Sequence, residues 1–220
     1  MNAGQELHNR GRSDNADDFR RVFVVRVHEL LALGYARLPH ADYAETDEPS
    51  ITGFLAEAVR ELLDDPPEAI DSWCDNYSIA DEAPENTEGR TGKGRRKIDI
   101  RFESSEQRPR NRFRFEAKVL RTSVTEYFSS GLRRFLIGAY APDDDDAGML
   151  GYVQRRSEVE WAKELESRLE SDKTRLRVTV DGLWSAEEVS ESLRYSYRSR
   201  HTREHQLGDI TLYHTLLRFY

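Results

Sequence analysis

The sequence has little cysteine and no long apolar run. Cys74 is the single cysteine among 220 residues, which excludes an internal disulfide and a thiolate-rich zinc site and is typical of a reducing compartment. No apolar run approaches the roughly 20 residues that cross a bilayer, and the first residues are polar where a signal peptide would be apolar. We therefore expect a cytoplasmic protein with no membrane segment.

Summed over the whole chain, positively charged residues are fewer than negatively charged ones. The chain has 33 Lys and Arg against 41 Asp and Glu, a net charge of -8, which would disfavour nucleic acid if the charge were evenly spread. It is not evenly spread. Residues 41–88 hold fifteen acidic residues and one cation, whereas residues 89–121 hold twelve cations and four acidic residues. A basic segment therefore directly follows an acidic one.

The length and the hydrophobic periodicity predict one α/β domain with a central mixed sheet flanked by helices. We expect residues 1–16 to form a flexible N-terminal arm and residues 17–220 a single domain, with its core at about 51–154 and a C-terminal elaboration at 155–220. Apolar residues at helical spacing predict helices at 19–33, 51–62, 123–140 and 159–169. Alternating or apolar runs predict strands at 76–80, 97–102, 112–119, 149–153, 175–180 and 209–219.

Two of these strands carry the residues that point to chemistry. Asp99 lies on the polar face of the strand at 97–102, and Glu116 and Lys118, two residues apart, share a face of the strand at 112–119. If the strands form a hairpin, two carboxylates and one amine converge. Two carboxylates suit Mg²⁺, which keeps several waters, one of which can act as a nucleophile. A solvated ion pair of little energetic value is the alternative.

The pattern of Asp99 followed by Glu116-Ala117-Lys118 resembles the PD-(D/E)XK nuclease superfamily, the restriction-endonuclease-like fold. The resemblance extends over about residues 51–154, from an acidic helix through the hairpin to a further helix and strand. The proline of the family name is absent, because Ile98 precedes Asp99. The resemblance implies that Asp99 and Glu116 bind Mg²⁺, for which Mn²⁺ substitutes, and that Lys118 assists the attacking water.

The resemblance also implies further site residues. Glu57, on the helix before the hairpin, would add a catalytic, metal-binding carboxylate, and Glu48 is a competing upstream acid. Gln154 follows the strand at 149–153, where some members of the superfamily carry an active-site glutamine. The simpler alternatives are a solvated helix face for Glu57 and a polar strand end for Gln154.

The basic segment offers candidates for phosphate binding. A glycine-punctuated loop leads into the first motif strand, and further cations lie on the second strand. Pairing with the preceding acidic segment is the alternative. The candidate nucleic-acid-binding residues are Arg90, Lys93, Arg95, Arg96, Lys97, Arg112 and Arg114.

Together these features predict a Mg²⁺-dependent nuclease that hydrolyses phosphodiester bonds, with double-stranded DNA as the expected substrate. The motif does not distinguish DNA from RNA, or internal from terminal cleavage. Cutting both strands needs two sites, so we expect a homodimer or a subunit of a multi-protein complex; the resemblance suggests a bacterial antiviral defence effector. The alternative is a catalytically silent nuclease-fold subunit that binds nucleic acid or assembles a complex. If the protein is an active nuclease, the acidic segment 41–88 or the run Asp143–Asp146 is a candidate to occupy the basic residues, in place of phosphate, until a partner displaces it.

Overall fold

The computed structural model describes residues 3–85 and 95–220, with side chains from residue 18 onward. Within these residues one mixed sheet has the strand order β1-β2-β3-β4-β7-β6-β5. β3 and β4 are parallel, as are β4 and β7, and the other neighbours are antiparallel. The strands are β1 (Tyr77–Pro84), β2 (Lys97–Ser104), β3 (Asn111–Leu120), β4 (Asp146–Val153), β5 (Ser185–Ala186), β6 (Ser196–Thr202) and β7 (Asp209–Arg218).

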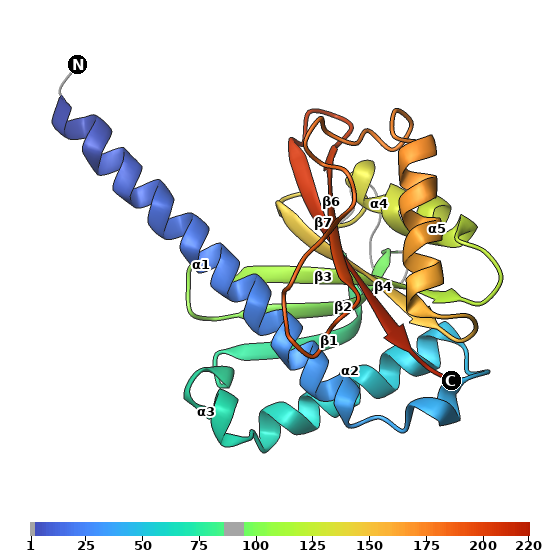
Figure 1. Ribbon diagram of the computed structural model, residues 1–220. Helices are drawn as coiled ribbons and strands as arrows, with labels where there is room; N and C mark the ends of the chain where they lie inside the picture. The colour runs from blue at the N-terminus through green and yellow to red at the C-terminus, as the bar shows by residue number, and fades with distance from the viewer. Residues whose placement is uncertain (1–2, 86–94) are drawn as a thin grey trace.

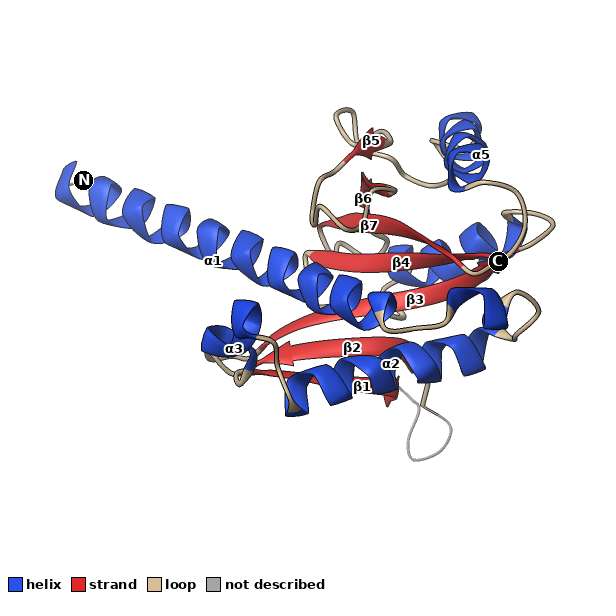
Figure 2. Cartoon of the chain, turned by 60° about the horizontal axis from the view of Figure 1, so that its bottom comes forward, coloured by secondary structure: helices blue, strands red, loops and turns tan. Residues whose placement is uncertain are grey.

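Helices cover both faces of this sheet. Figure 2 shows α1 and α2 crossing in front of it, and buried side chains of η3, α4 and α5 pack on its other face. α1 extends well beyond the body of the protein (Figure 1). The helices are α1 (Ala3–Ala36), α2 (Glu48–Asp64), α3 (Glu68–Cys74), α4 (Arg133–Leu136) and α5 (Glu158–Ser171), with the 3-10 helix η1 (His40–Tyr43) and the π-helical turn η3 (Tyr127–Leu132).

Two apolar cores hold these layers together. The first joins α1, α2 and α3 to the sheet through side chains such as Leu30, Leu55 and Phe115, all fully buried. The second joins η3, α4 and α5 to the sheet through side chains such as Phe135 and Trp161, also fully buried. Burying such a side chain contributes about 1.5–3 kcal/mol, so these two cores fix the positions of the elements that carry the site.

The predicted α/β class, with a mixed sheet flanked by helices, is confirmed. The hairpin of β2 and β3 is also confirmed. Burial alternates along β2 as predicted, but in β3 six consecutive residues from Phe113 to Lys118 are buried, because acidic and basic partners cover the side chains of Arg114, Glu116 and Lys118. The predicted helix at 123–140 is shorter: η3 and α4 end before Gly138, which has a φ of 66° and leaves the right-handed region. The predicted strand at 175–180 is reduced to a single bridge between Val178 and His201.

The N-terminal helix is longer than its apolar pattern indicates. α1 begins at Ala3 and so includes most of the segment expected to form a flexible arm. The proposed division into an arm and one domain remains a prediction. Across the described part of the chain, no helix combines the length and the apolar character needed to cross a membrane.

Candidate active site

The ladder between β2 and β3 ends at the first motif residue. The strands pair from Ser104 with Asn111 to Ile100 with Phe115, so the next pair in this register would be Asp99 and Glu116. Here a side chain replaces a backbone carbonyl as the acceptor: the Asp99 Oδ2 atom accepts a hydrogen bond from the Ala117 N–H at 2.7 Å. The end of the ladder therefore fixes Asp99 between the two strands.

Glu116 is the most buried charged group of the site. Its side chain is 1% exposed, and its Oε1 lies 3.0 Å from Lys118 Nζ and 2.9 Å from Arg134 Nη1. Its Oε2 is buried and has no hydrogen-bond partner among the residues described. Burial raises the pKa of Glu116 to about 8, and the nearby Asp99 carboxylate adds repulsion. One oxygen of this carboxylate is thus paired, and the other is buried without a partner among the residues described.

Glu48 completes the group from α2. The Asp47 carboxylate accepts the Ser50 N–H at 2.9 Å and caps the helix, which makes Glu48 its first residue. From there Glu48 Oε1 accepts a hydrogen bond from Lys118 Nζ at 2.7 Å. Burial raises the pKa of Glu48, although the Lys118 ammonium opposes this shift.

Lys118 thus has carboxylates on two sides. Burial lowers its pKa, but the Glu116 and Glu48 carboxylates outweigh this effect and the net pKa is raised. The ammonium therefore stays charged at neutral pH. We call Glu48, Asp99, Glu116 and Lys118 the carboxylate–lysine cluster.

Glu57 lies elsewhere on α2. Its side chain is 61% exposed and pairs with Arg60 at 2.7 Å, and Arg60 also pairs with Asp81 of β1. Between the two upstream acids, the structure brings Glu48 to the cluster. No contact joins Glu57 to the cluster within the part of the chain that is described.

Gln154 is buried behind the site. Its Nε2 donates to the carbonyl oxygens of Tyr43 and Thr46 at 2.8 and 2.7 Å, and its Oε1 accepts from Arg121. These bonds hold the segment that leads into α2. Gln154 therefore supports the position of Glu48, and the described contacts do not bring it to the carboxylates.

Several predicted phosphate-binding residues have acidic partners. Arg114 is only 8% exposed in its side chain and pairs with Glu85 at 2.8 Å and with Asp144. Arg112 pairs with Glu103 at 3.2 Å. Lys97 pairs with Glu82 at 2.5 Å. The buried partners of Arg114 leave it little access to a phosphate, which favours the alternative of pairing with the acidic segment.

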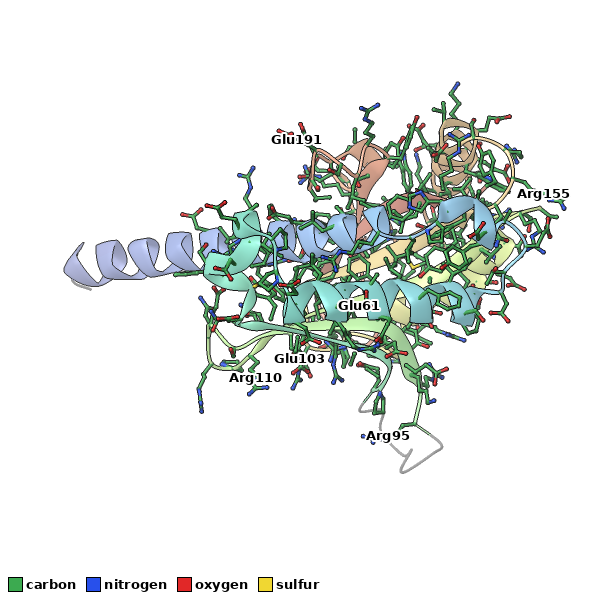
Figure 3. The ribbon with its side chains drawn as sticks, turned by 90° about the horizontal axis from the view of Figure 1, so that it is seen from below. Glu61, Arg95, Glu103, Arg110, Arg155 and Glu191 are labelled. Atoms are coloured by element: carbon green, nitrogen blue, oxygen red, sulfur yellow. The ribbon has the colours of Figure 1, made fainter. Side chains whose placement is uncertain are left out.

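The remaining predicted cations are half-buried or lie outside the described residues. Arg110, just before β3 and not among the predicted residues, also reaches the Glu103 carboxylate at 3.8 Å, and Figure 3 shows the two side chains close together. Arg95, labelled in Figure 3, and Arg96 directly precede β2 and are half-buried. Arg90 and Lys93 lie outside the described residues.

The acidic run Asp143–Asp146 is held by arginines from three parts of the chain. Asp144 pairs with Arg114, and Asp145 and Asp146 pair with Arg20 of α1. Arg203 donates to the carbonyl oxygens of Ala141, Pro142 and Asp144. The run thus engages one of the predicted phosphate-binding residues, and its regulatory role remains a prediction.

Sequence reasoning did not single out Arg134 and Tyr140 as site residues. Arg134 reaches Glu116 because η3 lies directly on the sheet: a Cβ on Gly131 would come within 2.6 Å of the Met149 side chain. A larger residue at this position would require the end of the Met149 side chain to move. The run Gly131-Leu132-Arg133-Arg134 was the available signal, but the sequence alone does not show which arginine faces β3.

Counting only the described residues, no group of three or more His, Cys, Asp or Glu side chains has metal-binding geometry. Comparisons with family models, curated proteins and solved structures found no match to this chain.

Proposed function

We propose that this protein is a metal-dependent nuclease that hydrolyses phosphodiester bonds at the carboxylate–lysine cluster. The observation that carries the proposal is the convergence of Glu48, Asp99, Glu116 and Lys118 from one helix and two strands. Perturbed pKa values in a cluster of like charges are typical of functional sites, because such a cluster costs stability.

The chemistry of Asp99 and Glu116 suits a hard divalent cation that keeps several waters, although the described residues supply no set of three protein ligands with metal-binding geometry. Mg²⁺ and Mn²⁺ prefer carboxylate oxygens, and Glu116 Oε2 is a buried oxygen with no partner among the residues described. Asp99 and Glu116 would hold the ion, with Glu48 beside them. When bound, such an ion lowers the pKa of a water molecule and offsets charge on a phosphoryl oxygen.

The chain's own groups have distinct roles in this proposal. The Ala117 N–H fixes the Asp99 carboxylate at the end of the ladder. Lys118 stays protonated, since Glu116 and Glu48 raise its pKa, and it therefore orients the attacking water and stabilises negative charge rather than accepting a proton. Glu48 holds the ammonium in place at 2.7 Å.

Duplex DNA is the proposed substrate, and a homodimer or a larger assembly would supply two active sites. A role as a cytoplasmic effector of bacterial antiviral defence follows from the resemblance to the PD-(D/E)XK superfamily. The order of α2, β1, β2, β3, α4 and β4 is compatible with that resemblance.

One observation favours the silent subunit as a second candidate. Lys118 and Arg134 both contact Oε1 of Glu116, an arrangement that also suits a buried structural ion pair. Such a protein would bind nucleic acid or a partner without cleaving.

Cleavage assays separate the two candidates. Purified protein is incubated with supercoiled plasmid and with single-stranded RNA, in Mg²⁺, Mn²⁺ or EDTA. The nuclease proposal expects metal-dependent cleavage that is lost in Asp99→Ala and Lys118→Ala, with both variants folded by circular dichroism. The matched control, Glu57→Gln, should cleave as wild type. Inactivity of the wild type on both substrates, with binding retained, would favour the silent subunit.

A further inference from the structure

Arg134 occupies the side of the cluster that is open to solvent. Its Nη1 donates to Glu116 Oε1 at 2.9 Å and to the Tyr140 hydroxyl at 2.7 Å. Its side chain is 38% exposed, whereas Glu116 is 1% and Lys118 8% exposed. Arg134 therefore combines a contact to the buried carboxylate with a guanidinium that solvent or a ligand can reach.

Tyr140 fixes the direction of the guanidinium. The Tyr140 hydroxyl donates to the Lys97 carbonyl at 2.8 Å, so its lone pair is available to accept from Arg134. The guanidinium also lies 5.3 Å from the centre of the Tyr140 ring, a favourable cation–π distance. Because Lys97 lies two residues before Asp99 on β2, Tyr140 ties Arg134 to the strand that carries the first motif carboxylate.

The unused donors of Arg134 match a phosphate. Both bonds are made by Nη1, and Nε and Nη2 have no partner in the described contacts. These donors form a planar fork that binds two oxygens of a phosphate together, which a lysine cannot do. The preceding residue, Arg133, points elsewhere, since its guanidinium lies 3.9 Å from Glu204.

We infer that Arg134 is a phosphate-binding residue of the site: its guanidinium contacts a non-bridging oxygen of the phosphodiester group held beside Glu116 and Lys118, and Tyr140 is its positioning residue. The inference rests on the proposed nuclease function. It assigns a role to a residue outside the D…ExK pattern.

The first test is binding of a fluorescent DNA duplex in EDTA, where no metal-dependent cleavage occurs, over a range of salt concentrations. Arg134→Ala should weaken binding about tenfold and reduce the salt slope by about 0.9, the value for one phosphate contact. Arg133→Ala removes the same charge one residue away and should leave both quantities near the wild-type values.

The second test is cleavage. Arg134→Ala should lower kcat by about a hundredfold or more, as expected for loss of a donor that stabilises transition-state charge. Arg134→Lys keeps the charge beside Glu116, and hence the fold, but should still lower kcat by about tenfold because the fork is lost. Tyr140→Phe should lower kcat in the wild-type background and have little further effect in Arg134→Lys, since it acts through the guanidinium.

The outcomes distinguish this inference from the proposed function. If the wild type cleaves and Arg134→Ala and Arg134→Lys match Arg133→Ala in affinity, salt slope and kcat, the inference is wrong and the nuclease proposal stands. If the wild type binds but does not cleave, the affinity and the salt slope still decide the role of Arg134. If it neither binds nor cleaves nucleic acid, both proposals fail.

Discussion

Two groups of polar side chains beside the sheet, each in contact with η3 or α4, differ in how their atoms are satisfied. One is the carboxylate–lysine cluster. The other is a chain of neutral groups: the Tyr127 hydroxyl lies 2.9 Å from His214 Nδ1, and Ser199 Oγ lies 2.7 Å from the Nε2 atoms of His214 and His201. His201 Nδ1 ends the chain 2.7 Å from the Leu176 carbonyl. We call this the histidine chain.

The histidine chain is complete in itself. If His201 Nδ1 donates to the Leu176 carbonyl, its Nε2 accepts from Ser199, and Ser199 in turn accepts from His214. Every polar atom in this arrangement has a partner, and burial keeps both imidazoles neutral by lowering the pKa of His201 to about 4 and that of His214 well below its usual value. A satisfied buried network of this kind contributes rigidity.

The cluster has the opposite character. Burial and the Asp99 carboxylate raise the pKa of Glu116 to about 8, and Glu116 Oε2 lacks a partner among the residues described. Stability alone does not favour this arrangement, because a buried carboxylate costs free energy. The histidine chain is therefore a structural network. The carboxylate–lysine cluster costs folding free energy, and ligand binding and chemistry would explain why it is kept.

The largest expected effect comes from neutralising the cluster. Glu116→Gln should lower the cleavage rate by about a thousandfold or more, the scale seen when a central catalytic group is removed. It should not lower the melting temperature at pH 8.5, because it removes a buried charge. Loss of activity together with a large fall in melting temperature would contradict the functional interpretation.

The next effect compares the two acids of α2. Glu48→Gln removes the carboxylate beside Lys118 and should lower the rate by about tenfold or more, whereas Glu57→Gln should stay within about twofold of wild type. Initial rates on the same plasmid substrate provide the measurement. The reverse order would place Glu57 in the site and overturn the assignment of Glu48.

Breaking the histidine chain should affect stability instead. Ser199→Ala leaves the facing nitrogens of His201 and His214 unpaired and should cost about 1–3 kcal/mol, or roughly 3–10 °C in melting temperature. The cleavage rate, measured well below the transition, should remain close to that of the wild type. Ser171→Ala, at the exposed end of α5, is the control and should leave the melting temperature unchanged.

The smallest effect for a single group is a loss of stability in mild acid. The pKa of His201 is lowered to about 4, so its contribution is fully present above the unfolded value of about 6.5 and is lost as pH falls toward 4. His28 on α1, also buried and lowered to about 4, behaves in the same way. Urea unfolding should show a loss of roughly 1–2 kcal/mol per histidine between pH 7.5 and 5.5.

The urea unfolding at these two pH values should be measured on the Glu116→Gln variant. The pKa of Glu116 is raised to about 8, so its contribution to stability is lost as pH rises through 8 and recovered as pH falls, which opposes the histidine effect. Equal free energies of unfolding at pH 7.5 and 5.5 in this background would show that the histidines are not held neutral by the fold.

Local pattern predicted the parts of the site that lie on strands. Alternation alone places Asp99, Glu116 and Lys118 on the polar faces of β2 and β3, because a strand repeats every two residues. The choice between Glu48 and Glu57 depends instead on where α2 begins and which side meets β3. That choice is determined by the Asp47 cap and by tertiary packing.

Contacts between residues far apart in the chain could not be predicted from the sequence. Arg114 alternates with the same polar face as Glu116, yet Glu85 and Asp144, each about thirty residues away, bury it as an ion pair. Arg134 enters the site because Gly131 packs against Met149 of β4. Charge counts locate a basic segment but do not show which of its cations are already paired.

Calorimetric titration of Mn²⁺ tests the central claim most directly, since it asks whether the cluster binds a metal, independently of substrate. The account predicts that wild-type protein binds Mn²⁺ and that Glu57→Gln binds it equally well. Glu116→Gln, folded by circular dichroism, should show no binding at the same concentrations. No binding by the wild type, or equal binding by all three proteins, would contradict the assignment of the carboxylate–lysine cluster as a metal-dependent active site.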